Sequence, residues 1–454
     1  MILYMMPCNK YKYRYIFILS LLLSIRIIEV FGQVPVVKIP QRATVSHGAI
    51  IGNSNNRNSP ILNIPAFPTV SNSNQQLNMY ERDRLEVQHM NMQQKSDEDL
   101  ATLSSIQYDL PSWSGAQGTE YYYQTAKEIF DMLNGKTPLN LKDAVFSVEN
   151  AYFEGLLDKK KYDENISTMA NIARLKAVQD GYNWNNPITK NIMLYRVISD
   201  TLSVKFPTKE RASISFPMQY DFDDFQGEQD FSKLFVTKLL SSHKGQCHSL
   251  PLLYLILCEK VGAEASLAFS PQHSYIKFKD KKNNWHNLEL TQGMMVTDAF
   301  IIGSGFINAA AIKHGVYMQP QTKEQVIAQC LSDLASGYIH KYGYDKFVIQ
   351  CIDSVLAHAP TNTSALAMKS NYHSIQLSYV AHQVGSPPPD TLKVNYPQIY
   401  KLFEERNNVY RKLDEIGFVE MPKEIYQTWL NSVNKEKERR EHDIRYQNAL
   451  RLIE

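Results

Sequence analysis

The sequence predicts an α+β protein in which a helix that carries a cysteine at its start packs on a small antiparallel sheet, with flanking helices before it and an α-helical C-terminal region after it. Two observations predict the core. The polar residues 244–247 change abruptly into the apolar run 250–258, as at the start of a buried helix. Three short strand-like segments follow that run directly, and helical periodicity dominates the remainder of the chain.

The composition is that of a globular protein. The chain has 454 residues, of which 44% are hydrophobic and 21% are charged, so two or three folded units are expected. The net charge of +2 includes no basic block, which argues against a nucleic-acid partner. Few cysteines follow residue 32, so the fold is not built on disulfides. Cys330 and Cys351 could pair, but we favour their interpretation as small apolar side chains on helix faces.

The N-terminal residues 1–32 are typical of a signal peptide. Basic residues precede the apolar run 16–25, and Arg26 and Glu29 then interrupt it. These charges disfavour a membrane-spanning helix, although an N-terminal membrane anchor is the alternative. We therefore expect export to the periplasm or the exterior, with no stable membrane insertion after removal of the signal.

Composition divides the rest of the chain into four parts. Residues 33–104 form a low-complexity linker whose Asn-, Ser- and Pro-rich first part cannot bury enough apolar surface to fold, and an amphipathic helix over 79–104 is an option within it. The remaining parts are a main α+β domain over 105–320 with its core at 215–305, a helical region over 321–385, and a helical tail over 386–454.

Apolar periodicity places the elements of the main domain. It predicts helices over 120–133, 139–157, 159–180, 187–203 and 230–241. The cysteine helix is expected over 249–261, with Pro251 in its first turn and Gly262 at its end. Strands are expected over 265–269, 274–279 and 285–290, and the polar turn 279–284 joins the last two as a hairpin.

The region after residue 321 resembles a tetratricopeptide repeat over 329–362. Pro360 as the closing proline of such a unit places Gly343 at its turn, and the second helix then buries one apolar face: Val348, Ile352, Val355 and Leu356. A second, weaker match begins at residue 363. The resemblance implies a surface for a protein partner. Helices over 397–416 and 422–454 follow, the latter with a charged, solvated face.

Cys247, His273 and Glu289 form a candidate catalytic triad. A cysteine at the positive end of a helix dipole favours the thiolate. His273 begins a strand and can move a proton, and Glu289 on the paired strand can orient the imidazole, because cross-strand neighbours lie about 5 Å apart at Cβ. This is the order of residues in a thiol acyl-transfer site.

Other residues are candidates for the cleft around the triad. N–H groups at the helix start supply half of an oxyanion hole, and Gln219 or Tyr220 is a weak candidate for the second donor. The cleft is expected to be lined by His248, Trp285 and His286. A zinc site formed by Cys247, His248, His273 and His286 lacks the usual paired spacing, so we expect no metal and no cofactor.

Three segments together resemble the transglutaminase-like superfamily, in particular its compact bacterial core domains. They are residues 244–255, 271–273 and 285–291. The resemblance implies a papain-like core with Cys247 as nucleophile, His273 as base and Glu289 as orienting acid. Trp285, Leu288 and Thr291 match the framing residues of the last motif. The family usually has Asp where this chain has Glu289, a departure that bears on activity more than on fold.

The sequence therefore predicts an exported, cysteine-dependent acyl-transfer enzyme. It would hydrolyse or transamidate an amide bond of a peptide or protein substrate through a thioester on Cys247. The alternative is a catalytically degenerate scaffold that binds a protein partner through its tetratricopeptide-like helices. An envelope assembly factor that uses the same helices is a third option.

Overall fold

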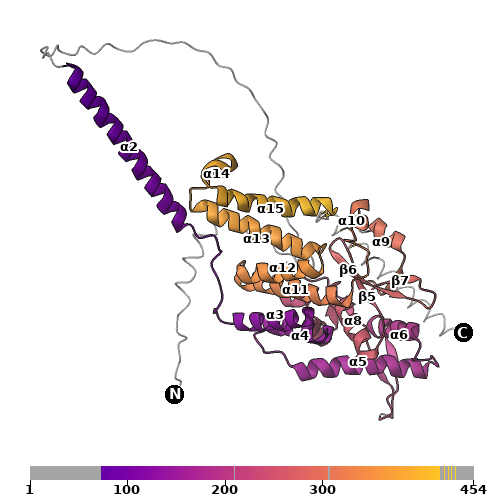
Figure 1. The fold of residues 1–454 in the computed structure, drawn as a ribbon. Coiled ribbons are helices and arrows are strands. Elements are labelled where there is room, and N and C mark those ends of the chain that lie inside the picture. The colour runs from indigo at the N-terminus through magenta and orange to yellow at the C-terminus, as the bar shows by residue number, and fades with distance from the viewer. Residues whose placement is uncertain are drawn as a thin grey trace, which may run out of the picture. The chain divides into compact units, whose positions relative to one another are not determined.

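The computed structural model describes residues 73–208, 210–304 and 307–419, together with the isolated positions 424, 428, 431 and 435. The expected signal peptide 1–32, the linker up to residue 72 and most of the helix expected over 422–454 lie outside the described residues. The fold is α+β, as expected (Figure 1). The described chain divides into two units, one made of 109–378 and 388–419, the other of 73–108 and 379–387.

The first unit contains most of the helices and all the strands of the described chain. The helices before the sheet are α3 (Thr119–Leu133), α4 (Leu141–Tyr152), α5 (Lys159–Gln179), α6 (Pro187–Ser199), η1 (Phe231–Leu234), α7 (Val236–Ser242) and α8 (Ser249–Val261). The helices after it are α9 (Asp298–Ser304), α10 (Ala309–Lys313), α11 (Lys323–Tyr342), α12 (Lys346–His358), α13 (Thr363–His382), α14 (Pro389–Asn395) and α15 (Pro397–Glu415).

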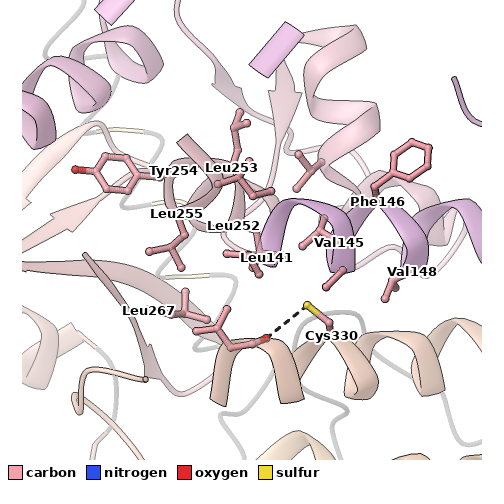
Figure 2. Packing of buried hydrophobic residues seen from close by; sticks show 14 of the residues in the cluster. Leu141, Val145, Phe146, Val148, Leu252, Leu253, Tyr254, Leu255, Leu267 and Cys330 are labelled. Atoms are coloured by element: carbon pink, nitrogen blue, oxygen red, sulfur yellow. Dashed lines mark hydrogen bonds between the residues drawn. The ribbon is translucent and has the colours of Figure 1, made fainter. Parts of the chain in front are cut away.

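Helix α8 is the centre of the hydrophobic core. Its residues from Ser249 to Cys258 are all buried, because the helices α4, α5, α6 and α7 and the strands β5 and β6 all contact it. Figure 2 shows side chains of α4, α8, β5 and α11 meeting in this core. Gly262 ends α8 in the left-handed conformation, as the sequence predicts.

The sheet that faces α8 has four antiparallel strands in sequence order. They are β5 (Ser266–Ser270), β6 (His273–Lys279), β7 (Trp285–Glu289) and β8 (Met294–Val296). The first three agree with the expected strands to within a residue, whereas β8 was not predicted. Ile276, Phe278 and Leu288 from this sheet belong to the same apolar core as α8, so the strand faces that carry them are fixed by packing.

Two further strand pairs were also not predicted. β1 (Leu202–Val204) pairs antiparallel with β2 (Ser213–Ser215), and β3 (Gln219–Tyr220) pairs in parallel with β4 (Lys244–Gly245). The helix expected over 187–203 therefore ends at Ser199, and its last residues form β1. The parallel pair matters for the site, because β4 leads directly into the turn that holds Cys247.

The helix expected over 230–241 is wrong in one respect, because the structure divides it into η1 and α7. Phe235 between them is extended, with φ −85° and ψ 144°. The buried carboxylate of Glu149 on α4 accepts hydrogen bonds from the N–H groups of Val236 (2.6 Å) and Thr237 (2.8 Å). This distant carboxylate satisfies the first N–H groups of a new helix, and local periodicity gives no sign of it.

The region expected to form a tetratricopeptide-like unit consists of the antiparallel helices α11 and α12, followed by α13. α11 begins at Lys323, six residues before the expected start, where Thr322 and Gln325 form a capping box. Gly343 ends α11 with φ 89°, and the expected face of α12 is buried except for half-buried Leu356. Cys330 and Cys351 are both free and buried.

The second unit contains α2 (Ser73–Ser105), in the part of the chain expected to be a low-complexity linker. A helix is present where one was expected over 79–104, but it has no buried apolar face, because the described side chains of α2 are exposed on every side. Gln383 of the same unit donates to the main chain of Gln107 at 2.8 Å. None of the helices that the structure describes is long and apolar enough to span a membrane.

We expect the substitution Gly245→Ala to lower the free energy of unfolding by about 1–3 kcal/mol. A Cβ atom at Gly245 would lie 2.6 Å from Oγ of Ser249 and 2.9 Å from a methyl group of Leu239. Ser249 cannot give way, because it is fully buried and its hydroxyl accepts from the N–H of Gln246 at 3.1 Å. Urea unfolding followed by circular dichroism measures the change.

Gly303 in helix α9 provides the matched control, because a Cβ atom added to it would have no other atom within 4 Å. Gly303→Ala should leave stability unchanged or raise it. Equal stability of Gly245→Ala and the native protein would show that the turn before Cys247 is not tightly packed.

Candidate active site

Cys247 lies in the turn between β4 and α8, one residue before His248, which caps the helix. The first helical hydrogen bond runs from the N–H of Leu250 to the carbonyl of Gln246 at 3.0 Å, so the thiol is carried at the amino end of α8. The Cys247 residue is fully buried, with 0% of its surface exposed. The site is therefore closed in this structure.

His273 is the first residue of β6, directly after a tight turn. Ser270 and His273 are paired across β5 and β6, which leaves Pro271 and Gln272 as the turn residues. Gln272 has φ 54°, in the left-handed region. Its carbonyl oxygen lies 3.8 Å from Sγ of Cys247, where it can accept the thiol proton. The turn thus both places the histidine and covers the thiol.

Glu289 ends β7 and holds the imidazole of His273. Its Oε2 lies 2.5 Å from Nε2 of His273, and both side chains are buried. Its Oε1 accepts from the N–H (3.0 Å) and the hydroxyl (2.6 Å) of Thr291. Because both carboxylate oxygens are bound, the carboxylate is fixed in orientation and the imidazole with it.

The charges of the site support one another. Burial alone lowers the pKa of His273, but the negative charges of Glu289 and Cys247 and side-chain hydrogen bonds to both residues outweigh burial and raise it. Burial raises the pKa of Glu289, but the charge of His273 and the hydrogen bonds from His273 and Thr291 lower it below its usual value. The pair therefore exists as imidazolium and carboxylate.

The structure brings the thiol and the imidazole together. The charge of Cys247 and a side-chain interaction with it are among the causes that raise the pKa of His273, so the two side chains lie within interaction distance. A second contact ties the same elements, because the hydroxyl of Ser274 donates to the main-chain carbonyl of Cys247. Cysteine, histidine and carboxylate thus form one connected chain across α8, β6 and β7, which is the arrangement expected from the sequence.

Of the other candidate residues, some lie near Cys247 and some lie far from the triad. Gln219 is exposed on β3, whereas Tyr220 is buried beside Gly245, its Cα partner on β4. The structure does not bring Trp285 and His286 to the triad. Both lie at the opposite end of β7, four and three residues before Glu289, or ~13 and ~10 Å along a strand. Lys279 lies 4.8 Å from the Trp285 ring, and His286 pairs with Asp280 at 3.1 Å.

His248 points to the helical region. Its Nε2 lies 3.3 Å from Oδ2 of Asp333 on α11. Burial lowers the pKa of His248, but the charge of Asp333, a hydrogen bond to it and the charge of Glu149 outweigh burial and raise it. The residue after the cysteine therefore anchors the start of α8 to α11. Among the described residues no group of three or more His, Cys, Asp or Glu side chains could hold a metal ion.

Gln246 is the polar residue of the site that the sequence analysis did not select. It directly precedes Cys247 and has 0% of its surface exposed, and neither atom of its side-chain amide has a hydrogen-bond partner in the described part of the chain. An unpaired buried amide costs about 1–3 kcal/mol, so its retention suggests a ligand. The available signal was its position: a polar side chain directly before the candidate nucleophile Cys247.

Comparisons with protein-family models, with curated proteins and with solved structures gave no match for this chain.

The buried pair predicts how stability depends on pH. We expect Glu289→Gln to lower the free energy of unfolding by about 3–5 kcal/mol, because it leaves a buried imidazolium without its counter-ion. A raised histidine pKa contributes stability fully below the ordinary value of 6.5, and this stability is lost as the pH rises through the folded pKa. A lowered carboxyl pKa contributes stability above the ordinary value of 4.5, and this is lost on acidification.

The difference between native protein and variant should therefore be largest between about pH 4.5 and pH 6.5. Urea unfolding from pH 4 to pH 9 measures it. The control is Glu324→Gln, which breaks an ion pair with His358 at 2.6 Å in which the Glu324 side chain is half exposed. This substitution should lower the free energy of unfolding by less than ~1 kcal/mol at every pH. A pH-independent effect of Glu289→Gln would contradict an ion pair at the site.

Proposed function

We propose that this chain is a cysteine-dependent acyl-transfer enzyme that cleaves an amide bond of a peptide or protein through a thioester on Cys247. The observation that carries the proposal is the buried chain of contacts from Cys247 through His273 to Glu289. The sequence resemblance to the transglutaminase-like superfamily and the position of the cysteine at the start of a helix on a small antiparallel sheet support it.

The reaction would proceed in two steps. The Cys247 thiolate attacks the carbonyl carbon and forms a C–S bond, and His273 gives its proton to the nitrogen that leaves as the C–N bond breaks. In the second step His273 takes a proton from water, the resulting hydroxide forms a C–O bond at the thioester carbon, and the C–S bond breaks. An amine in place of the water would give transamidation. Glu289 would hold the imidazole in orientation and stabilise its charge through both steps.

The site must open for this chemistry, because Cys247 has no exposed surface. The Pro271–Gln272 turn that covers the thiol is the segment whose displacement would admit a carbonyl group to Sγ.

A scaffold without catalysis is the second candidate function, and the complete burial of Cys247 is the observation that favours it. In that case α11 to α13, which resemble tetratricopeptide helices, would bind a protein partner and the triad would be a structural network. In either case the signal-like sequence 1–32 supports our proposal that the protein is exported.

Selective alkylation distinguishes the two functions. At about pH 6 we expect iodoacetamide to label Cys247 at least ~10-fold faster than a free cysteine if the turn that covers it opens, because His273 lies beside its sulfur and can activate it. Burial raises the pKa of Cys258, Cys330 and Cys351, so these thiols serve as unreactive references in the same sample. Peptide mass spectrometry gives the rate at each cysteine.

His273→Ala should slow the labelling of Cys247 at least ~10-fold, and Cys258→Ala is the control that should leave it unchanged. Labelling of Cys247 as slow as that of Cys258 in the folded protein would favour the scaffold. A thioester adduct on Cys247, absent from Cys247→Ala, would establish acyl transfer directly.

Gln246 allows a test of substrate contact. If its amide binds the substrate, Gln246→Met should leave the free energy of unfolding unchanged or raise it by up to about 1 kcal/mol. The same substitution should lower kcat/KM about 10- to 100-fold, which corresponds to roughly 1.4–2.7 kcal/mol of transition-state binding. Gln329→Met is the matched control, because that buried glutamine donates to Asp333 at 2.9 Å and accepts from Asn362 at 2.7 Å. The control should lose stability. A similar loss for Gln246→Met would show that its amide is structural.

A further inference from the structure

One face of the sheet is polar and buried, which is unusual for a strand interior. Along β6 the side chains of His273, Tyr275 and Lys277 alternate onto one face, and on β7 Asn287 stands opposite Lys277. Tyr275, Lys277 and Asn287 are 1%, 4% and 3% exposed. The opposite face of the same strands packs into the apolar core. A lysine and an amide at such depth require a counter-group.

The counter-group is a single carboxylate. Oδ1 of Asp298, the first residue of α9, lies 3.3 Å from Nζ of Lys277 and 2.8 Å from Nδ2 of Asn287. Tyr275 lies on the same face of β6, two residues before Lys277, and its ring centroid is 5.9 Å from Nζ of Lys277. We call Lys277, Asn287 and Tyr275 the carboxylate cradle.

The cradle has more hydrogen-bonding capacity than Asp298 uses. The hydroxyl of Tyr275 and Oδ1 of Asn287 are buried and have no hydrogen-bond partner among the described residues. Both N–H groups of Asn287 are engaged, with Asp298 and with the carbonyl of Val296 at 3.2 Å, so the orientation of this amide is settled. The cradle thus offers a free acceptor and a free hydroxyl beside its bound carboxylate.

Asp298 is far more exposed than the groups that bind it. The Lys277 side chain is 5% exposed and stands on β6, between β5 and β7. The Asp298 side chain is 58% exposed. From Asp298 to Gly303, only Ile301 of α9 is buried, and Phe300 and Ile302 are 41% and 42% exposed. Ile301 packs with Ala268 and Tyr275 in a small apolar cluster, so displacement of α9 would expose that cluster, whereas the cradle itself is fixed by the sheet.

We propose that Lys277, Asn287 and Tyr275 form a binding site for the carboxy-terminal residue of a peptide, and that Asp298 stands in for its carboxylate in this structure. The carboxylate would bind Nζ of Lys277 and Nδ2 of Asn287, with Tyr275 donating its hydroxyl to it. The main-chain N–H next to that carboxylate would bind Oδ1 of Asn287. The carboxylate of such a residue matches the donors that now bind Asp298, and its adjacent N–H matches the unpaired Oδ1 of Asn287.

The position of the cradle relates it to the triad. Lys277 is four residues from His273 along β6, or ~13 Å at about 3.3 Å per residue. An extended peptide of about four residues covers that distance. The binding site stands by itself, but its connection with catalysis rests on the proposed function: the enzyme would act near the carboxy terminus of its substrate, within about four residues of the free carboxylate.

Binding is tested without turnover, in the full-length Cys247→Ala protein. Adding Asp298→Ala empties the cradle, and we expect the melting temperature to fall and then to recover by about 2 °C or more with saturating N-acetylglycine. N-acetylglycinamide, which lacks the carboxylate, should give no recovery. Acetate, which lacks the N–H, should give less recovery at equal concentration and ionic strength. Lys277→Met combined with Asp298→Ala should abolish the effect.

Absence of recovery, or equal recovery with the glycinamide, would overturn the proposal and leave an ordinary ion pair. If Asp298→Ala does not fold, the same ligands are compared on the protein that retains Asp298, where N-acetylglycine must still bind at least ~10-fold more tightly than the glycinamide. The connection with catalysis is tested separately. A peptide with a free carboxy terminus should be cleaved at least ~10-fold faster than its amidated form, and Lys277→Met should remove this preference. Carboxylate binding without that preference would contradict only the connection with the active site.

Discussion

The buried contact between His273 and Glu289 is the constraint on which the rest of the site depends. Two charged side chains at 2.5 Å in the protein interior must stay paired, since each alone would be costly to bury. The register of β6 against β7 therefore cannot shift by one residue, because a shift would turn Glu289 to the apolar face. The pair thus fixes the sheet as well as the imidazole, and Ser274 then ties β6 to the Cys247 turn.

The surroundings of Glu289 hold its long side chain in place. Glu289 reaches the imidazole with one carboxylate oxygen while Thr291 binds the other through its main chain and its hydroxyl. The longer side chain leaves no gap to the histidine, and its extra torsional freedom is removed by these contacts. Nothing in the geometry of this pair opposes the catalytic role that we propose for it.

Three unpaired polar residues lie beside the site or on its sheet, and others, such as the hydroxyls of Tyr122 and Tyr344, lie elsewhere in the described chain. The amide of Gln246, the hydroxyl of Tyr275 and the amide oxygen of Asn287 all lack partners in the part of the chain that the structure describes. One lies directly before the cysteine, and the other two lie on the strands that carry His273 and Glu289. Unsatisfied buried groups of this kind are rare and are often found at functional sites, which supports our proposal that one face of the sheet serves recognition while the other packs into the core.

The sequence by itself predicted the elements with strong local periodicity, because apolar spacing, caps and turn residues act over a few positions. It also pointed to the three residues Cys247, His273 and Glu289 that the structure brings together. Only the tertiary structure decided what depends on contacts between distant residues. Glu149 starts α7 from 87 positions away, strand spacing carries Trp285 away from the triad, and Asp298 fills the carboxylate cradle from a helix that periodicity did not reveal. Register, burial and charge pairing are set by packing across the whole chain, and no local window of sequence contains them.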